Sequence, residues 1–264
     1  MLTISDICAI MARLSPPEMA QNYDNTGLLI GKREMPVNGV LCALDVTDQV
    51  IDEAISLGAN MIISHHPLIF GKVTKITDDT RLGRAIMRII QNNIAVYAAH
   101  TNLDSAHGGT NDCLAEKLGL TNITPLLLED GEKPLLGRMG ELNAPMTLDK
   151  LARFIAVSLN LPTVKFVGNA SLKISTVAVC SGSGGSPAYF KRALACGCNC
   201  YITGDVTYHN AQAAAEMGLS LIDATHFATE IIVTEKLASY LTAETAGIAV
   251  HASSVESNIF NYSI

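Results

Sequence analysis

The chain has no tryptophan, and none of its apolar runs approaches the roughly 20 residues that a membrane-spanning helix needs. Its first residues, Met1–Asp6, lack the basic stretch that opens a secretory signal peptide, so we expect no such signal. Lysine and arginine form no cluster, and the net charge is −7. A surface for nucleic-acid phosphates needs concentrated positive charge. We therefore expect neither a membrane nor a nucleic acid as a partner.

The seven cysteines are an odd number, which argues against a complete set of disulfides. Cys42 and Cys180 lie inside apolar segments, as reduced and buried thiols of a cytoplasmic protein do. The cysteines of Cys196–Cys200 alternate across a helix end and an apolar strand. Because these positions straddle the helix end and the strand, we expect the cysteines to point to opposite faces, and we interpret them as structural and not as a zinc site.

With 264 residues, 48% of them hydrophobic, the chain can form one large or two ordinary domains. The same order of segments occurs twice. Amphipathic helices are predicted after Thr3 and again after Thr147, each with a threonine cap. Strand, helix and strand segments follow in both halves, and the predicted helices end at glycine. We therefore predict two α/β repeats from an internal duplication, residues 1–126 and 127–264, separated by the Pro- and Gly-rich stretch 125–137.

Aligning the two repeats pairs several polar residues that follow apolar strands. His65 aligns with Gly204 and His66 with Asp205; with a gap of one residue, His100 aligns with His226 and Asp104 with Glu230. In α/β folds, ligands bind beyond the carboxyl ends of the strands. If the halves pack about a pseudo-twofold axis, these residues face one cleft.

Histidines and carboxylates in this pattern favour a metal site. His65 and His66 follow the apolar segment Met61–Ser64, and His226 and Glu230 are spaced to share one helical face. Separately, the first pair is typical of a surface turn and the second of a helix-start ion pair. Together with Asp104 they favour metal binding, and five ligands exceed the needs of one ion. We therefore predict two divalent ions per chain.

Two further motifs have an ordinary and a functional interpretation. The segment Asp24–Leu28 is a polar turn, or it brings a polar group to the cleft. The segment Ser181–Pro187 follows a strand and opens a helix, so it is a flexible turn or a cradle for an anion on backbone N–H groups. It lacks the spacing of a nucleotide-binding loop.

Taken together, these motifs resemble the Nif-three-like family, whose bacterial members are commonly labelled GTP cyclohydrolase 1 type 2 homologues. The resemblance covers essentially the whole chain and matches the short form, which has no domain inserted between the halves. The motifs that carry it are Tyr23–Leu28, Ser64–Leu68, Ala99–Asp104, Thr203–Asp205 and Thr225–Glu230.

The resemblance implies two similar α/β domains, a dinuclear metal centre in the cleft between them, and a toroidal homohexamer. It implies as metal ligands His65, His66, Asp104, His226 and Glu230. It does not include His100 among the usual ligands, although the internal repeat nominates it. We therefore expect His100 to stand beside the metals as a catalytic acid or base.

The expected activity is metal-dependent hydrolysis of a small nucleotide- or pterin-like substrate, in which two metals activate water. The ligand set suits Zn, Fe, Mn or Ni, and the sequence does not distinguish among them. The alternative is a non-enzymatic metal-binding ring that handles metal or binds other proteins.

Overall fold

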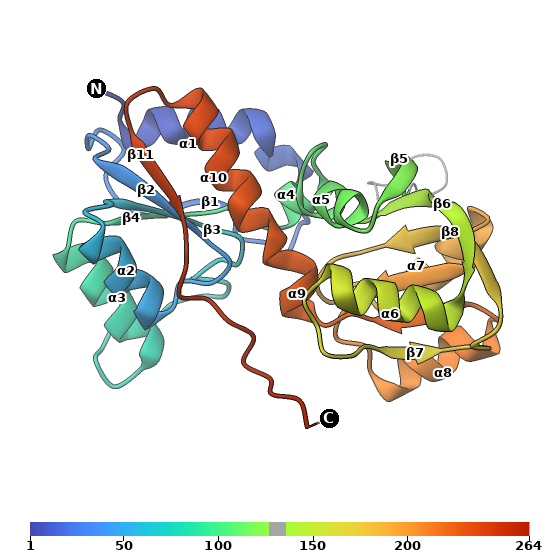
Figure 1. Cartoon of the computed structure of the whole chain (residues 1–264). Coiled ribbons are helices and arrows are strands. Elements are labelled where there is room, and N and C mark those ends of the chain that lie inside the picture. The colour runs from blue at the N-terminus through green and yellow to red at the C-terminus, as the bar shows by residue number, and fades with distance from the viewer. Residues whose placement is uncertain (127–135, 264) are drawn as a thin grey trace. The chain divides into compact units, whose positions relative to one another are not determined.

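The computed structural model describes residues 1–126 and 136–263. They form two compact units, each with its own sheet (Figure 1). The first unit contains residues 1–107 and 233–257, and the second contains residues 108–232 and those from Asn258 onward. Most of the segment in which the sequence places the boundary between the repeats, residues 127–135, lies outside the described residues.

The first unit has a five-stranded sheet of order β1-β4-β3-β2-β11. The strands β4, β3, β2 and β11 are parallel, and β1 is an antiparallel edge strand. The strands β2, β3 and β4 are buried along their whole length, as parallel strands covered on both faces are. The strands span Gly27–Ile30 (β1), Gly39–Ala43 (β2), Met61–Ser64 (β3), Ala95–Ala98 (β4) and Ala249–Ala252 (β11).

Helices cover both faces of this sheet (Figure 1). Met61 and Ile63 of β3 pack in the apolar cluster shared with α1 and α10, whereas Ile62 packs in the cluster shared with α2 and α3. This alternation follows from the two-residue period of a strand. The helices span Ile4–Leu14 (α1), Asp48–Ser56 (α2), Arg81–Gln91 (α3) and Ile232–Glu244 (α10).

The second unit has a six-stranded sheet of order β5-β6-β8-β9-β10-β7. Its strands β8, β9 and β10 are parallel. Three antiparallel strands flank them: β6 pairs with β8, β5 pairs with β6, and β7 pairs with β10. The strands span Leu120–Pro125 (β5), Arg138–Thr147 (β6), Lys165–Val167 (β7), Lys173–Val179 (β8), Cys200–Thr203 (β9) and Ser220–Asp223 (β10).

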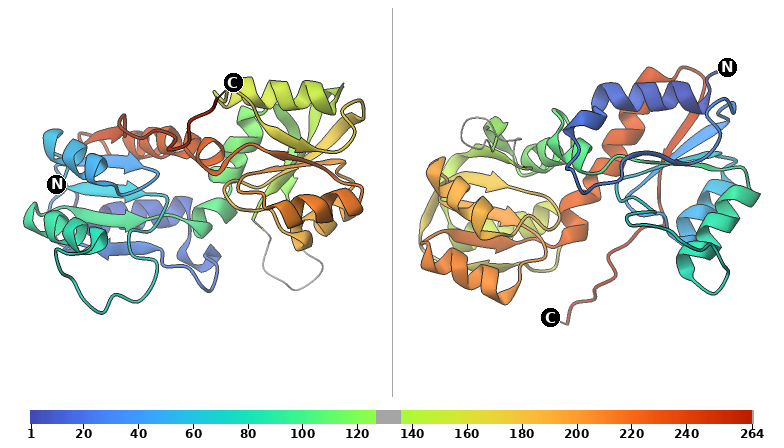
Figure 2. Two further views of the ribbon diagram at one scale, coloured as in Figure 1. Left: turned by 90° about the horizontal axis from the view of Figure 1, so that it is seen from below. Right: turned by 180° about the vertical axis from the view of Figure 1, so that it is seen from behind.

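Helices also enclose the second sheet, with α6 on one side and α7 and α8 on the other (Figure 2). The helix α5 joins α6 in the apolar cluster on its side. The helices span Thr110–Lys117 (α5), Leu148–Ser158 (α6), Pro187–Ala195 (α7) and Tyr208–Glu216 (α8).

Several local predictions are confirmed. The Thr3 hydroxyl accepts from the backbone N–H of Asp6 and the Asp6 carboxylate accepts from Thr3, which closes a capping box at α1. Thr147 caps α6 in the predicted way. Cys198 and Cys200 are buried in the clusters on opposite faces of the second sheet. Burial raises the pKa of the Cys198 thiol to about 12 and raises that of Cys200 further.

The two units share one plan, as the internal duplication predicts. In each, a central strand is flanked by its parallel neighbours, and an antiparallel strand lies beyond one of them, giving β1-β4-β3-β2 in one sheet and β7-β10-β9-β8 in the other. His66 follows β3 and Asp205 follows β9, which occupy the same place in the two sheets. The predicted equivalence of these two positions is therefore confirmed.

The last helix and strand of each repeat belong to the other unit. The helix α5 and strand β5 end the first repeat, yet they pack in the second unit, where β5 pairs with β6. The helix α10 and strand β11 end the second repeat, yet they pack in the first unit, where β11 pairs with β2. The compact units are thus divided differently from the repeats 1–126 and 127–264, because a terminal helix and strand were exchanged in both directions.

Leu237→Ala tests whether α10 belongs to the core of the first unit. Leu237 is fully buried among the residues of α1 and the first sheet, so its truncation should lower the free energy of unfolding by about 2–5 kcal/mol. Lys236→Ala, on the exposed side of the same helix, should change it by less than about 0.5 kcal/mol. Chemical denaturation measures both, and equal stability of the two variants would contradict this packing.

Candidate metal centre

The first unit carries its candidate ligands on loops after two neighbouring parallel strands. The strand β3 ends directly before His65 and His66, and β4 ends two residues before His100. His100 opens the short helix α4 (Thr101–Ser105), which carries Asp104. Because β3 and β4 pair in parallel and end in register, these loops lie at the same edge of the sheet.

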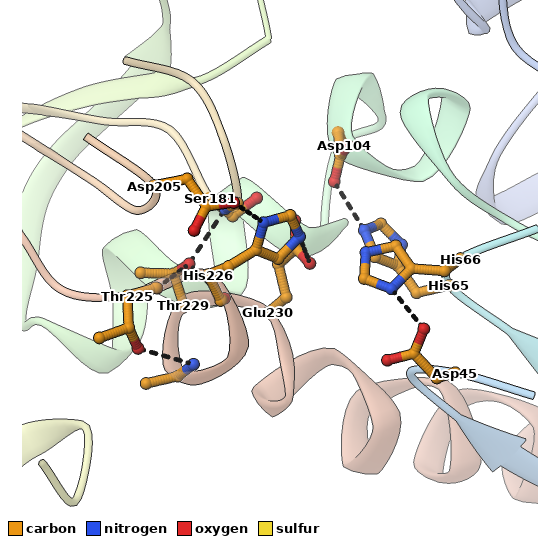
Figure 3. A network of polar contacts seen from close by, with 12 residues as sticks. Asp45, His65, His66, Asp104, Ser181, Asp205, Thr225, His226, Thr229 and Glu230 are labelled. Atoms are coloured by element: carbon orange, nitrogen blue, oxygen red, sulfur yellow. Dashed lines mark hydrogen bonds and ion pairs between the residues drawn. The ribbon is translucent and has the colours of Figure 1, made fainter. Parts of the chain in front are cut away.

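These side chains converge within the first unit. The imidazoles of His65, His66 and His100 each offer a ring nitrogen, and these nitrogens lie within 4.8 Å of one another. Nε2 of His65 lies 3.5 Å from Oδ1 of Asp104, and Figure 3 shows the carboxylate directed at this ring. His65 is fully buried and Asp104 is 6% exposed, so both face a region largely shielded from solvent.

Hydrogen bonds at Nδ1 orient the adjacent histidines. Nδ1 of His65 donates to the carbonyl oxygen of Ala99 at 2.8 Å. Nδ1 of His66 donates to Oδ1 of Asp45 at 3.0 Å, as Figure 3 shows. A carbonyl or a carboxylate can only accept, so each ring carries its proton on Nδ1 and presents the lone pair of Nε2. This arrangement is common for histidines that bind metals.

A second carboxylate holds the loop that carries Asp45. Both oxygens of Glu256 accept at 2.8 Å from backbone N–H groups, one from Leu44 and one from Asp45. Burial raises the pKa of Glu256, and the negative charge of Asp45 adds to this, against the lowering effect of the two backbone donors. The chain therefore fixes His66 through Asp45, and Asp45 through Glu256.

The third imidazole of the first unit is bound in the same way. Nδ1 of His100 lies 2.9 Å from Oδ1 of Asp24, whose side chain is fully buried. Burial by itself would raise the pKa of Asp24, but hydrogen bonds from His100 and Thr101 hold it well below its usual range. Asp24 is thus an ionised carboxylate, and Nε2 of His100 faces away from it.

The second unit carries its two candidate ligands on α9 (His226–Glu230), which begins two residues after β10 ends. Nε2 of His226 lies 2.9 Å from Oε2 of Glu230, and Nδ1 of His226 lies 2.7 Å from Oδ2 of Asp205 (Figure 3). Asp205 and Thr225 both adopt positive φ, at 52° and 64°. Positive φ is uncommon for residues other than glycine and most unusual for a β-branched residue such as threonine, and such conformations cluster at functional sites.

The positions that match the histidine pair have a different use in the second unit. Gly204 stands where the first unit has His65, and a Cβ atom there would lie 2.5 Å from the backbone nitrogen of His226. No imidazole fits at this position. Asp205, which matches His66, instead binds Nδ1 of His226. The duplicated positions therefore carry candidate ligands in one unit, and in the other Asp205 holds the candidate ligand His226.

The glycine-rich loop Ser181–Pro187 packs against the α9 ligands. A Cβ atom on Gly182 would lie 2.1 Å from Oε1 of Glu230 and 3.3 Å from Nε2 of His226. The backbone N–H of Gly182 donates to the hydroxyl of Thr229 at 3.0 Å, and its carbonyl accepts from Gly204 at 2.8 Å. This close approach explains the first glycine of the loop. Anion binding by the loop stays a prediction.

The structure shifts two predicted correspondences by a residue, that of His100 with His226 and that of Asp104 with Glu230. The strands β4 and β10 end at Ala98 and Asp223, and each is followed by two residues before its short helix begins. Counted from the strand ends, His100 matches Thr225, the N-cap of α9, and not His226. The gap introduced into the sequence alignment was therefore unnecessary.

Both groups fit a divalent metal in their donor chemistry. Around a tetrahedral ion with bonds of about 2.0–2.1 Å to nitrogen and oxygen, neighbouring ligand atoms lie about 3.3 Å apart. The pairs His65–Asp104 and His226–Glu230 have nitrogen–oxygen separations of 3.5 and 2.9 Å, on either side of this value. Imidazole and carboxylate donors with Nδ1 anchored are the set that Zn and its neighbours accept.

Sequence reasoning named the candidate ligands but did not predict which residues orient them. Asp45 follows the end of a buried strand, and so does Asp205, which was the available signal. For Asp24 the sequence offered only the choice between a turn and a group that reaches the site. Nothing in the sequence marked Glu256.

The fold and the site define the class of protein. It is a duplicated α/β protein with imidazole–carboxylate groups at the ends of its strands. Comparison with known proteins identifies the family. The model of the Duf34/NIF3 (NGG1p interacting factor 3) family matches residues 2–259. The chain belongs to this family. In the described part of the chain, no helix has the length and apolar character needed to cross a membrane.

Relatives and solved structures agree with this assignment. A Clostridium acetobutylicum protein named "GTP cyclohydrolase 1 type 2 homolog" is 41% identical, over 89% of this chain and 90% of its own. The alignment with the Halalkalibacterium halodurans protein of the same name is 29% identical and spans 365 positions, covering 97% of this chain and 98% of that protein. A Staphylococcus aureus hypothetical protein, SA1388, superposes with a TM-score of 0.91 at 33% identity, covering 98% of this chain and 99% of that one.

Gly182→Ala tests the contact between the loop and Glu230. The added methyl group would occupy space that the carboxylate now fills, so the affinity for Zn²⁺ should fall by roughly 10–100-fold. Gly197→Ala is the matched control, since Gly197 also has positive φ but no heavy atom near its Cβ position among the described residues. Both variants should lose about 1 kcal/mol of stability from backbone strain. Equal Zn²⁺ affinities by calorimetric titration would contradict the assigned contact.

Proposed function

We propose that the chain is a dinuclear divalent-metal hydrolase that acts on a small nucleotide- or pterin-like substrate. The observation that carries this proposal is the common orientation of four histidines. His65, His66, His100 and His226 are each bound through Nδ1 to an acceptor on the chain, so each presents Nε2. The stability of the fold does not require four imidazoles with this common orientation, so we infer that the orientation serves binding at Nε2.

The proposed ligands come from both units. We assign as ligands His65, His66 and Asp104 of the first unit and His226 and Glu230 of the second, which are enough donors for two ions. One ion with an open position takes three protein ligands, so five ligands suit a pair. The two buried carboxylates balance part of the positive charge. The donor types accept Zn, Fe, Mn or Ni.

The remaining residues define what the chain itself contributes to hydrolysis. Bound divalent ions supply Lewis acidity. His100 holds or accepts a proton at Nε2, as a general acid or base does. Asp45 and Asp205 hold the rings of His66 and His226 in place.

The substrate class and the assembly form part of the proposal. Relatives of the chain are named as homologues of a GTP cyclohydrolase, which directs a substrate search toward nucleotides and pterins. We further propose a cytoplasmic homo-oligomer, with a toroidal hexamer as the expected form. A screen of metal-loaded protein against phosphorylated and cyclic small molecules, with Glu230→Ala as control, tests the activity.

The same screen separates the enzyme from the alternative function. Turnover that follows metal content and disappears in Glu230→Ala supports a hydrolase. Metal-dependent capture of a partner without turnover favours a ring that handles metal or binds proteins.

Metal stoichiometry gives a direct prediction. Protein purified without chelator and saturated with Zn²⁺ should hold two ions per chain by elemental analysis. Glu230→Gln keeps the shape of the side chain but removes its charge, so it should lose at least one ion. Glu235→Gln, an exposed change of the same kind on α10, should keep both. At most one ion in the saturated wild type would reject the dinuclear centre, and unchanged binding in Glu230→Gln would remove this ligand.

His100→Ala separates catalysis from metal binding. If His100 moves a proton and is not a ligand, the variant should keep both ions and lose roughly 10²–10⁴-fold in turnover. His209→Ala on the exposed side of α8 should change neither. Metal content and turnover are measured on one preparation. Loss of an ion would make His100 a ligand, and full activity with both ions bound would show that it takes no part.

A further inference from the structure

The carboxylate of Asp24 is buried, ionised and not used by the ligand set. It lies in the turn between the short 3₁₀ helix Pro17–Met19 and β1, 76 residues before the histidine that it contacts. Its Oδ1 accepts from Nδ1 of His100 at 2.9 Å and from the backbone N–H of Asn25 at 2.8 Å. Its Oδ2 accepts from the N–H of Thr101 at 2.9 Å and from the Thr101 hydroxyl.

The Thr101 hydroxyl fixes the direction of this network. It accepts from the backbone N–H of Gln21 at 2.9 Å, so its own proton points to Asp24. With Thr101 donating twice to one oxygen, the carboxylate cannot rotate without losing both contacts. The other oxygen is thereby held toward the imidazole of His100.

The backbone of His100 is held as well. Its N–H donates to Oδ1 of Asn102 at 3.0 Å, and the Asn102 amide donates to the carbonyl of Ser15 at 2.8 Å. The backbone N–H of His100 is therefore held by a side chain of α4, and its ring is held by Asp24. The ring of His100 lies with its centroid 5.2 Å from that of His65 and 5.7 Å from that of His66.

We propose that Asp24 is a positioning residue that fixes His100 as the tautomer with its proton on Nδ1 and its lone pair on Nε2. An ionised carboxylate can only accept, so the nitrogen that faces it must carry the proton. The motif Tyr23–Leu28 then has a defined role, because it carries a buried acceptor to the histidine beside the ligand pair. The assignment of the tautomer depends only on the hydrogen bonds of Asp24 and His100. A role of this tautomer in catalysis rests on the proposed function.

Burial distinguishes this pair from the two other aspartate–histidine pairs. The side chain of Asp24 is 0% exposed, whereas those of Asp45 and Asp205 are 51% and 52% exposed. Solvent competes for the exposed carboxylates, and electrostatic interactions are weaker there. Asp24 therefore restricts its histidine more strongly than the other two do.

The experiment is Asp24→Asn, observed in metal-free protein by long-range ¹H–¹⁵N NMR of the histidine rings. Two donors of Thr101 point to one oxygen position, and one backbone donor, the N–H of Asn25, points to the other, so we expect the amide oxygen on the Thr101 side and the NH₂ group toward His100. Nδ1 of His100 must then accept, and the proton moves to Nε2. An Asp→Asn change of this kind in a serine protease traps the wrong tautomer and lowers kcat about 10⁴-fold.

The expected result is a wild-type His100 with the lone-pair signal at Nε2 and a variant with this signal at Nδ1. His66 and His226, which have their own aspartates, serve as internal controls and should not change. A His100 that keeps its tautomer in Asp24→Asn would overturn the proposal. If that variant does not fold, the wild-type spectrum still decides the proposal, because a wild-type His100 with its lone-pair signal at Nδ1 would overturn it.

The metal-loaded protein separates this proposal from the proposed function. Asp24→Asn should retain its metal content and lose at least about 10²-fold in any turnover found, through the general acid or base. If no substrate is turned over by the wild type, the hydrolase proposal fails, while the NMR result still decides the role of Asp24. Tautomer inversion without loss of turnover would show that Asp24 positions a histidine that takes no part in catalysis.

Discussion

The hydrogen bond at Nδ1 of each candidate histidine is the interaction on which the site depends. An imidazole at the end of a strand can rotate about two bonds and can carry its proton on either nitrogen. A carbonyl or carboxylate at Nδ1 removes both freedoms, and the acceptors here come from other segments of the chain. The main contribution of the fold to the site is therefore a hydrogen-bond acceptor at Nδ1 of each candidate histidine.

The parallel strands explain how an acceptor comes to lie beside a candidate histidine. In both units the loops that carry candidate ligands follow strands that end in register, so an acidic residue after one strand reaches a histidine after its neighbour. Asp45 after β2 reaches His66 after β3, and Asp205 after β9 reaches His226 after β10. The duplication gave the two units this arrangement, and close packing at Gly204 then excluded an imidazole from the second.

Much of this was predictable from the sequence, and the limits have physical causes. The threonine caps, the repeated order of elements and the opposite faces of Cys198 and Cys200 rest on local patterns. The exchange of α10 and β11 does not, because an amphipathic helix and a short strand suit either sheet. The role of Glu256 could likewise not be predicted from the sequence, because it contacts Asp45 across 211 residues.

The one-residue shift between His100 and His226 shows how a repeat can mislead. An alignment that maximises identity places histidine on histidine, yet strand ends fix the backbone positions, and they pair His100 with Thr225. Thr225 uses its hydroxyl to cap α9, whereas the equivalent His100 has no capping bond and turns its ring to Asp24. Divergence at one backbone position thus gave a helix cap in one unit and an oriented imidazole in the other. The cap at Thr225 begins α9 at His226, so His226 and Glu230 lie in one helix at a spacing that makes their side chains neighbours.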